Sequence, residues 1–136
     1  MIVVDANVIA YLHIEGEKTA QAVALYGYDA DWIAPSLWEH EFLNVLANYV
    51  KQEGFSKHRA ILIWNEAFQL MSPRTRPVDM SLTLALAVDH GISAYDAQYI
   101  ELARSLGVIC VTEDKRLRNL FPRMAMSMRD YVLRSR

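Results

Sequence analysis

The sequence predicts an α/β fold in which helices cover a parallel sheet. Two short apolar runs rich in Val and Ile, residues 1–4 and 108–111, are typical of strands buried on both faces of such a sheet. Helical patterns fill the chain between them, and strands that alternate with helices indicate an α/β protein. With 136 residues, of which 53% are apolar and 22% charged, the chain matches one packed domain, which we expect to span residues 1–136.

The other elements follow from the hydrophobic pattern and its interruptions. Residues 32–34 are a weaker third strand candidate, and the segment between Pro73 and Pro77, where proline breaks the helical pattern, has room for another short strand. Gly54 and Ser56 separate two long helices, which we expect to pack as an antiparallel pair. The predicted helices cover residues 8–14, 17–26, 36–52, 57–70, 79–90 and 96–106, and a shorter one covers residues 115–120.

The composition excludes several classes of protein. The single cysteine, Cys110, rules out a disulfide framework and a multi-cysteine zinc site, and it indicates a reducing compartment. An acid, Asp5, follows only four apolar residues at the start, so we expect no signal peptide. The longest uncharged apolar stretch, residues 82–88, is far shorter than the roughly 20 residues that cross a bilayer. We therefore expect a cytoplasmic protein that does not span the membrane.

Three acids occupy sequence positions that lie at the carboxyl edge of the predicted parallel sheet. Asp5 and Asp114 follow the two buried strands, and ligands of such sheets bind in the crevice at the carboxyl ends of the strands. Helix amino termini lie on the same edge, and Asp96 falls in the first turn of a predicted helix. Each acid alone could simply cap a helix, so the site depends on their coincidence. Thr112 and Asn7 either support these acids or are ordinary strand-end and turn residues.

A fourth acid comes from the helix predicted over residues 36–52, which carries Glu39 and Glu41. These two positions are roughly 200° apart around a helix, so only one of them faces the crevice. Ser36 and Glu39 match a capping box, in which the Glu39 side chain bonds the Ser36 amide. Glu41 shares a partly polar face with Asn44, and we therefore expect Glu41 to be the fourth site residue.

Four carboxylates in one crevice imply a metal ion. Two unit charges about 4 Å apart repel by roughly 4 kcal/mol at an effective dielectric constant near 20, so four ionised acids need a cation among them. Oxygen ligands select a hard ion, Mg²⁺ or Mn²⁺, which suits the hydrolysis of phosphate esters. The histidines have no paired spacing and give no zinc site; they are His13, His40, His58 and His90.

The four acids lie within four short segments that follow one another along nearly the whole chain. The segments are Val3-Val4-Asp5-Ala6-Asn7-Val8-Ile9, Glu41-Phe42-Leu43-Asn44-Val45-Leu46, Ser93-Ala94-Tyr95-Asp96-Ala97-Gln98-Tyr99 and Val111-Thr112-Glu113-Asp114-Lys115-Arg116-Leu117. In this order they resemble the motifs of PIN-domain ribonucleases. In length and motif order the chain is similar to the toxin components of VapBC toxin–antitoxin pairs.

The resemblance implies a three-layer α/β/α sandwich with a central parallel sheet, and a metal-dependent endonuclease that acts on RNA. In such an enzyme, a water activated by carboxylate-bound Mg²⁺ or Mn²⁺ attacks the phosphodiester. The positions that match the catalytic, metal-binding quartet are Asp5, Glu41, Asp96 and Asp114, and Asn7 and Thr112 match the supporting polar positions.

The resemblance also implies partners. The family tends to form homodimers, and its toxin branch binds a small antitoxin that blocks the site. Glu113 stands where the family varies, and we expect it to face solvent. Candidates for contacts with the RNA backbone are Arg74, Arg76, Lys115, Arg116 and Arg118.

Two other functions fit part of the pattern. A phosphatase of the haloacid-dehalogenase type also places an Asp after its first strand and uses Mg²⁺, but it needs a second Asp where this chain has Asn7. A protein-interaction module would use the acids only as helix caps. The helix predicted over residues 57–70 is apolar around much of its surface, and we expect its Trp64 to contact a second copy or a partner, the alternative being burial in the core.

Overall fold

The computed structural model describes residues 1–134 and contains a five-stranded sheet. The strands lie in the order β3-β2-β1-β4-β5, and all neighbouring pairs are parallel. They are β1 (Ile2–Val4), β2 (Trp32–Pro35), β3 (Thr75–Arg76), β4 (Cys110–Val111) and β5 (Ala125–Met126). The strands predicted near the two ends of the chain are therefore neighbours at the centre of the sheet, with Val4 level with Val111.

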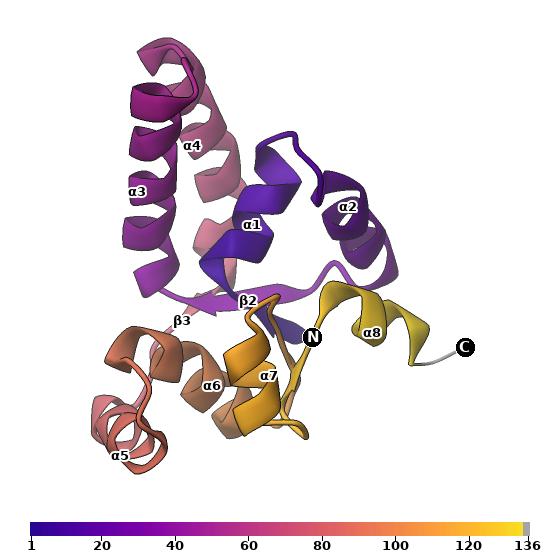
Figure 1. The fold of residues 1–136 in the computed structure, drawn as a ribbon, viewed down its shortest axis with the longest axis vertical. Helices are drawn as coiled ribbons and strands as arrows, with labels where there is room; N and C mark the ends of the chain where they lie inside the picture. The colour runs from indigo at the N-terminus through magenta and orange to yellow at the C-terminus, as the bar shows by residue number, and fades with distance from the viewer. Residues whose placement is uncertain (135–136) are drawn as a thin grey trace.

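Helices cover both faces of the sheet, as Figure 1 shows. One face carries α1 (Ala6–His13), α2 (Thr19–Tyr28), α3 (Leu37–Gln52), α4 (Lys57–Met71) and α8 (Met128–Leu133). The other face carries α5 (Met80–His90), α6 (Ala94–Leu106) and α7 (Lys115–Leu120). The predicted α/β/α sandwich with a central parallel sheet is confirmed. None of the helices formed by residues 1–134 is long and apolar enough to cross a membrane.

Side chains that alternate along the strands divide the core between the two faces. Ile2 and Val4 of β1 pack on the side of α1 to α4, whereas Val3 packs on the side of α6. All three side chains are fully buried, as expected of a strand covered on both faces. Because this central strand has no exposed face, polar groups can reach a site only from its ends.

The predicted antiparallel helix pair is present as α3 and α4, which project together beyond the sheet in Figure 1. Ser56 begins α4 by accepting a hydrogen bond from the Arg59 amide at 3.0 Å. Trp64 of α4 stacks on Trp38 of α3, with ring centroids 5.6 Å apart, and packs against the core. Trp64 is half-buried: one part of its ring takes part in the packing between the two helices, and the contact with a second copy or partner that we expected stays a prediction.

Two elements of the fold were not predicted, β5 and α8. The first has only two residues and pairs with β4, with Ala125 level with Cys110. The second has six residues and begins where the Ser127 side chain accepts a hydrogen bond from the Asp130 amide at 3.1 Å. A strand of two residues shows no alternation to detect, and α8, unlike the equally short α7, does not follow an acid already singled out as a possible helix cap.

The capping box expected at the start of α3 is not formed in the described part of the chain. Ser36 has helical backbone angles, φ −58° and ψ −18°, because β2 runs straight into α3, and its side chain makes no capping hydrogen bond. The Glu39 amide bonds instead to the Ser36 carbonyl oxygen at 3.1 Å. This part of the prediction was wrong because the box needs an extended residue at the cap position.

Candidate active site

The four predicted acids line one cavity at the carboxyl ends of the central strands. This carboxylate cavity has a volume of about 260 Å³. Asp5 and Asp114 reach it from the ends of β1 and β4, Glu41 reaches it from α3, and Asp96 from α6. Asn7, predicted as a supporting residue, also lines it.

Asp5 is held from two sides. Its Oδ1 accepts a hydrogen bond from the Val8 amide at 2.9 Å, which caps α1. Its Oδ2 accepts one from the hydroxyl of the fully buried Thr112. The Thr112 Oγ1 accepts in turn from the Asp114 amide at 3.1 Å. One buried hydroxyl therefore ties together the ends of β1 and β4 and orients two of the acids.

Asp114 caps a helix, and Asp96 lies in the first turn of one. Asp114 Oδ1 accepts from the Leu117 amide at 3.1 Å, which caps α7. The Asp96 amide donates to Ser93 Oγ at 3.0 Å in the first turn of α6. Asp5 and Asp114 therefore cap helices and also line the cavity, two roles that are alternatives from the sequence alone. For Asp96 the cap is Ser93, and the Asp96 side chain lines the cavity.

Glu41 is held by a residue that was not predicted. The Tyr99 hydroxyl donates a hydrogen bond to Glu41 Oε1 at 2.5 Å. Tyr99 is buried on α6 and lies three residues after Asp96, hence on the same helix face. That spacing is the signal that could have identified it. Among the described residues that line the cavity, Glu41 is present and Glu39 is not.

Glu113 does not face solvent, contrary to the expectation. Its side chain is only 16% exposed, and its Oε1 accepts from Lys18 Nζ at 3.2 Å. Its Oε2 accepts from the Met128 amide at 2.9 Å. Side chains alternate along an extended chain, so a residue between Thr112 and Asp114 points the other way, and there α2 and α8 cover it.

The predicted cations are divided between two edges of the sheet. Arg74 pairs at 2.8 Å with Asp31, which directly precedes β2. Arg116 lies near the acids: it donates to the Gly91 carbonyl at 2.7 Å, and burial raises the pKa of Asp96, a rise that the charge of Arg116 partly opposes. Arg116 therefore stays a candidate for contacts with a phosphate, whereas Arg74 does not.

Burial dominates the electrostatics of Asp5. It raises the pKa of the Asp5 carboxyl from 3.8 to about 6. The hydrogen bonds from Thr112 and Val8 oppose this shift, and the charges of Glu41 and Asp96 add to it. Ionising the Asp5 carboxyl in the folded chain therefore costs more free energy than ionising it in the unfolded chain.

The neighbouring acids respond in the same direction. Burial raises the pKa of Glu41 and of Asp96. The charge of Asp96 adds to the shift at Glu41, and the charge of Asp114 adds to that at Asp96. Burial also raises the pKa of Tyr11, with further contributions from nearby negative charges, of which Asp5 is the first.

The donor set of the carboxylate cavity fits a divalent cation. Its acids offer carboxylate oxygens, the ligands that Mg²⁺ and Mn²⁺ prefer. Among residues 1–134, none of the four forms an ion pair with Lys or Arg. In the same residues, no three His, Cys, Asp or Glu side chains already form a cluster that could hold a metal. A cation between the acids would relieve the repulsion that helps to raise their pKa values.

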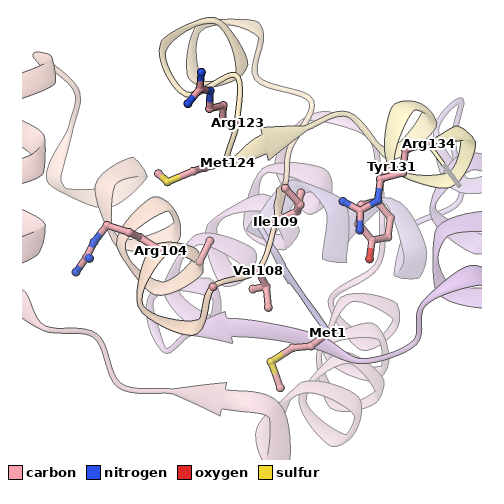
Figure 2. Close-up of a pocket in the computed structure, with 10 residues that line it drawn as sticks. Met1, Arg104, Val108, Ile109, Arg123, Met124, Tyr131 and Arg134 are labelled. Atoms are coloured by element: carbon pink, nitrogen blue, oxygen red, sulfur yellow. The ribbon is translucent and has the colours of Figure 1, made fainter.

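A larger cavity, of about 570 Å³, lies at the opposite edge of the sheet. Figure 2 shows that its wall includes residues that precede three of the strands, namely Met1, Ile109 and Met124. Three arginines are spread around its rim: Arg104, Arg123 and Arg134. The described residues that line it include no acid, so it is separate from the carboxylate cavity.

The chain is similar to known proteins in sequence. The family model of the PIN domain matches residues 2–121. Ribonuclease VapC3 of Pyrobaculum aerophilum is 30% identical over 130 residues, which cover 89% of this chain and 95% of that protein.

Two solved structures share the fold. The crystal structure of PAE2754 from Pyrobaculum aerophilum has a TM-score of 0.77 and 21% identity, and the match covers 98% of this chain and 94% of that chain. The crystal structure of FitAcB from Neisseria gonorrhoeae has a TM-score of 0.70 and 17% identity, and the match covers 94% of this chain and 98% of that chain.

Proposed function

The chain belongs to the PIN-domain family, and on this basis we propose that it is a metal-dependent endoribonuclease that hydrolyses RNA phosphodiester bonds in the carboxylate cavity. The observation that carries the proposal is the meeting of four acids from four segments in one cavity, Asp5, Glu41, Asp96 and Asp114. A relative with 30% identity is named a ribonuclease. The family match favours this function over the phosphatase.

We propose Mg²⁺ or Mn²⁺ as the cofactor, held by these four carboxylates with Asn7 at the margin. When bound, the ion supplies an activated water and neutralises charge that develops on the phosphate. Two hydroxyls position the ligands: Thr112 holds Asp5 and Asp114, and Tyr99 holds Glu41.

The protein itself contributes ligands and a cation in this mechanism. The pKa of Asp5 is raised to about 6 when no metal is bound; a bound cation would favour the ionised carboxylate, so Asp5 would serve as one of its ligands. Arg116, which lies beside Asp96, can contact a phosphate oxygen of the substrate.

We further propose that the protein is the toxin of a type II toxin–antitoxin pair that acts in the cytoplasm, with a small antitoxin and a second copy as partners. Its similarity to a VapC ribonuclease supports this role. Apolar side chains that are 40 to 72% exposed give surfaces for such contacts: Leu43, Ile61, Leu62 and Phe68 on α3 and α4, and Met80, Leu84 and Val88 on α5.

A matched pair of variants on α3 tests the proposed nuclease. Glu41→Gln removes a charged ligand, so we expect cleavage of a labelled single-stranded RNA in Mg²⁺ or Mn²⁺ to fall at least about 100-fold, or about 2.7 kcal/mol in activation free energy. Glu39→Gln leaves the cavity lining unchanged and should cleave like the parent protein. EDTA should stop cleavage by both. Full activity of Glu41→Gln, or metal-independent cleavage, would contradict the proposal.

A further inference from the structure

A second cavity adjoins the carboxylate cavity. It has a volume of about 370 Å³ and lies between α1, α3 and the loop that leads to α2. Asn7 and Val45 line both cavities, so the second begins where the first ends. We call it the tyrosine cavity because Tyr11 and Tyr49 line it farther out, together with Lys18.

Helix geometry puts both tyrosines one turn beyond the carboxylate cavity. Tyr11 follows Asn7 by four residues on α1, and Tyr49 follows Val45 by four residues on α3. Residues four apart share a helix face and are separated by a rise of about 6 Å. A nucleotide next to the scissile phosphate therefore falls beside the tyrosines.

The walls of the tyrosine cavity are braced. The ring of Tyr49 packs against Phe55, with centroids 5.1 Å apart. The loop before α2 is fixed by Thr19, whose hydroxyl donates to the Ile14 carbonyl at 3.1 Å and whose Oγ1 accepts from the Gly16 amide at 2.9 Å. A ligand that enters would therefore meet surfaces already held in place.

Lys18 supplies a positive charge next to an acidic site. Its Nζ lies 3.2 Å from Glu113 Oε1, and its side chain is 40% exposed. An ammonium has three donors, so this pair leaves two of them for a phosphate oxygen. Glu113 is itself fixed by the Met128 amide, which holds the lysine at the cavity wall.

We propose that the tyrosine cavity binds a nucleobase of the RNA strand next to the scissile phosphate, with the base against Tyr11 and Tyr49 and the adjoining phosphate near Lys18. This inference rests on the proposed nuclease function. Single-stranded RNA is commonly recognised by aromatic rings on which unpaired bases stack. A cavity of this volume, mostly apolar with a few polar groups, has the character of a small-ligand site.

Continuity between the cavities favours RNA over a peptide as the occupant. A strand whose phosphate lies at the acids can pass directly into the tyrosine cavity over Asn7 and Val45, because these residues line both cavities. Every base has a face that can stack, so this contact adds affinity with little preference for sequence. The tyrosine cavity thus binds the strand, and cleavage takes place in the carboxylate cavity.

The test is RNA binding by the full chain in an Asp96→Asn background, which slows cleavage. We measure fluorescence anisotropy with a labelled single-stranded RNA and with a sugar–phosphate chain of the same length that lacks bases. Tyr11→Ala should weaken RNA binding by roughly 5- to 150-fold and leave binding of the base-free chain unchanged. Tyr11→Phe keeps the ring and should bind RNA like the parent. Tyr28→Ala, an exposed tyrosine of α2 outside both cavities, should have no effect.

Lys18→Ala separates the phosphate contact from stacking. It should weaken both probes and make the salt dependence of binding shallower. The base-binding role is overturned if Tyr11→Ala binds RNA as tightly as the parent does, or if it loses affinity equally for the RNA and for the base-free chain. Unchanged RNA affinity is also the result expected if a protein partner occupies the cavity. If the parent protein does not cleave RNA but its RNA binding still depends on Tyr11, the proposed nuclease function is overturned and the base-binding role of the cavity is retained.

Discussion

Replacing Asp5 by Asn should abolish RNA cleavage and at the same time stabilise the metal-free fold. The pKa of Asp5 is raised to about 6 in the folded state, above its ordinary 3.8, so the folded protein holds this proton more tightly than the unfolded chain does. The contribution of Asp5 to stability is therefore greatest below about pH 4 and is lost as the pH rises through about 6. Asn carries no charge and escapes this loss, which is on the order of 3 kcal/mol at pH 7.

Urea unfolding in EDTA at several pH values measures this effect. Asp5→Asn should be no more stable than the parent near pH 4, and it should become more stable as the pH rises to 7. With saturating Mn²⁺ the order should reverse, because an ion that binds only the folded parent stabilises it. If Asp5→Asn is less stable than the parent at pH 7 in EDTA, the ionised Asp5 stabilises the metal-free fold, which would contradict the account.

Trp64→Glu should unfold the domain or come close to it. The ring of Trp64 stacks on Trp38 and also packs near Phe42 and Phe68. Removal of a fully buried large aromatic side chain costs about 3 to 5 kcal/mol. Trp64 is half-buried, so we expect a loss at the lower end of that range, to which the carboxylate adds the cost of a poorly solvated charge. Total stabilities of about 5 to 15 kcal/mol leave little margin for such a loss.

The matched control is Ile61→Glu, on the exposed side of the same helix, where the side chain is 50% exposed. Circular dichroism and thermal melting should show a native fold for Ile61→Glu and a large loss of stability for Trp64→Glu. A Trp64→Glu protein that melts like the parent but changes its oligomeric state would instead support the interface role expected from the sequence.

The central strands and the acids at their ends could be predicted because both depend on local sequence. A buried strand reads as a continuous apolar run, and the acid that follows it must fall at the carboxyl edge of the sheet. This logic led to Asp5 and Asp114. The spacing of Glu39 and Glu41 allowed only one of them to face the cavity; the capping box used to set Glu39 aside is not formed, whereas the polar face that Glu41 shares with Asn44 does line the cavity.

Contacts between distant segments could not be predicted. Glu113 is covered because Lys18, 95 residues away, and the start of α8 meet it in the fold. The Tyr99 hydroxyl reaches Glu41 across 58 residues. The expected capping box at Ser36 failed for a related reason, since sheet pairing of β2 fixes the direction in which the chain enters α3.

Binding of Mn²⁺ to the full chain, measured by titration calorimetry at pH 7 without RNA, tests most directly whether the four carboxylates form a metal site. The parent protein should bind Mn²⁺ and should release protons as it does so, since carboxyls with raised pKa values lose them to the ion. Asp96→Asn should weaken binding at least about 10-fold, which is about 1.4 kcal/mol, and Glu39→Gln should not change it. Absence of Mn²⁺ binding by the folded parent, or equal binding by Asp96→Asn, would contradict a metal centre in this cavity.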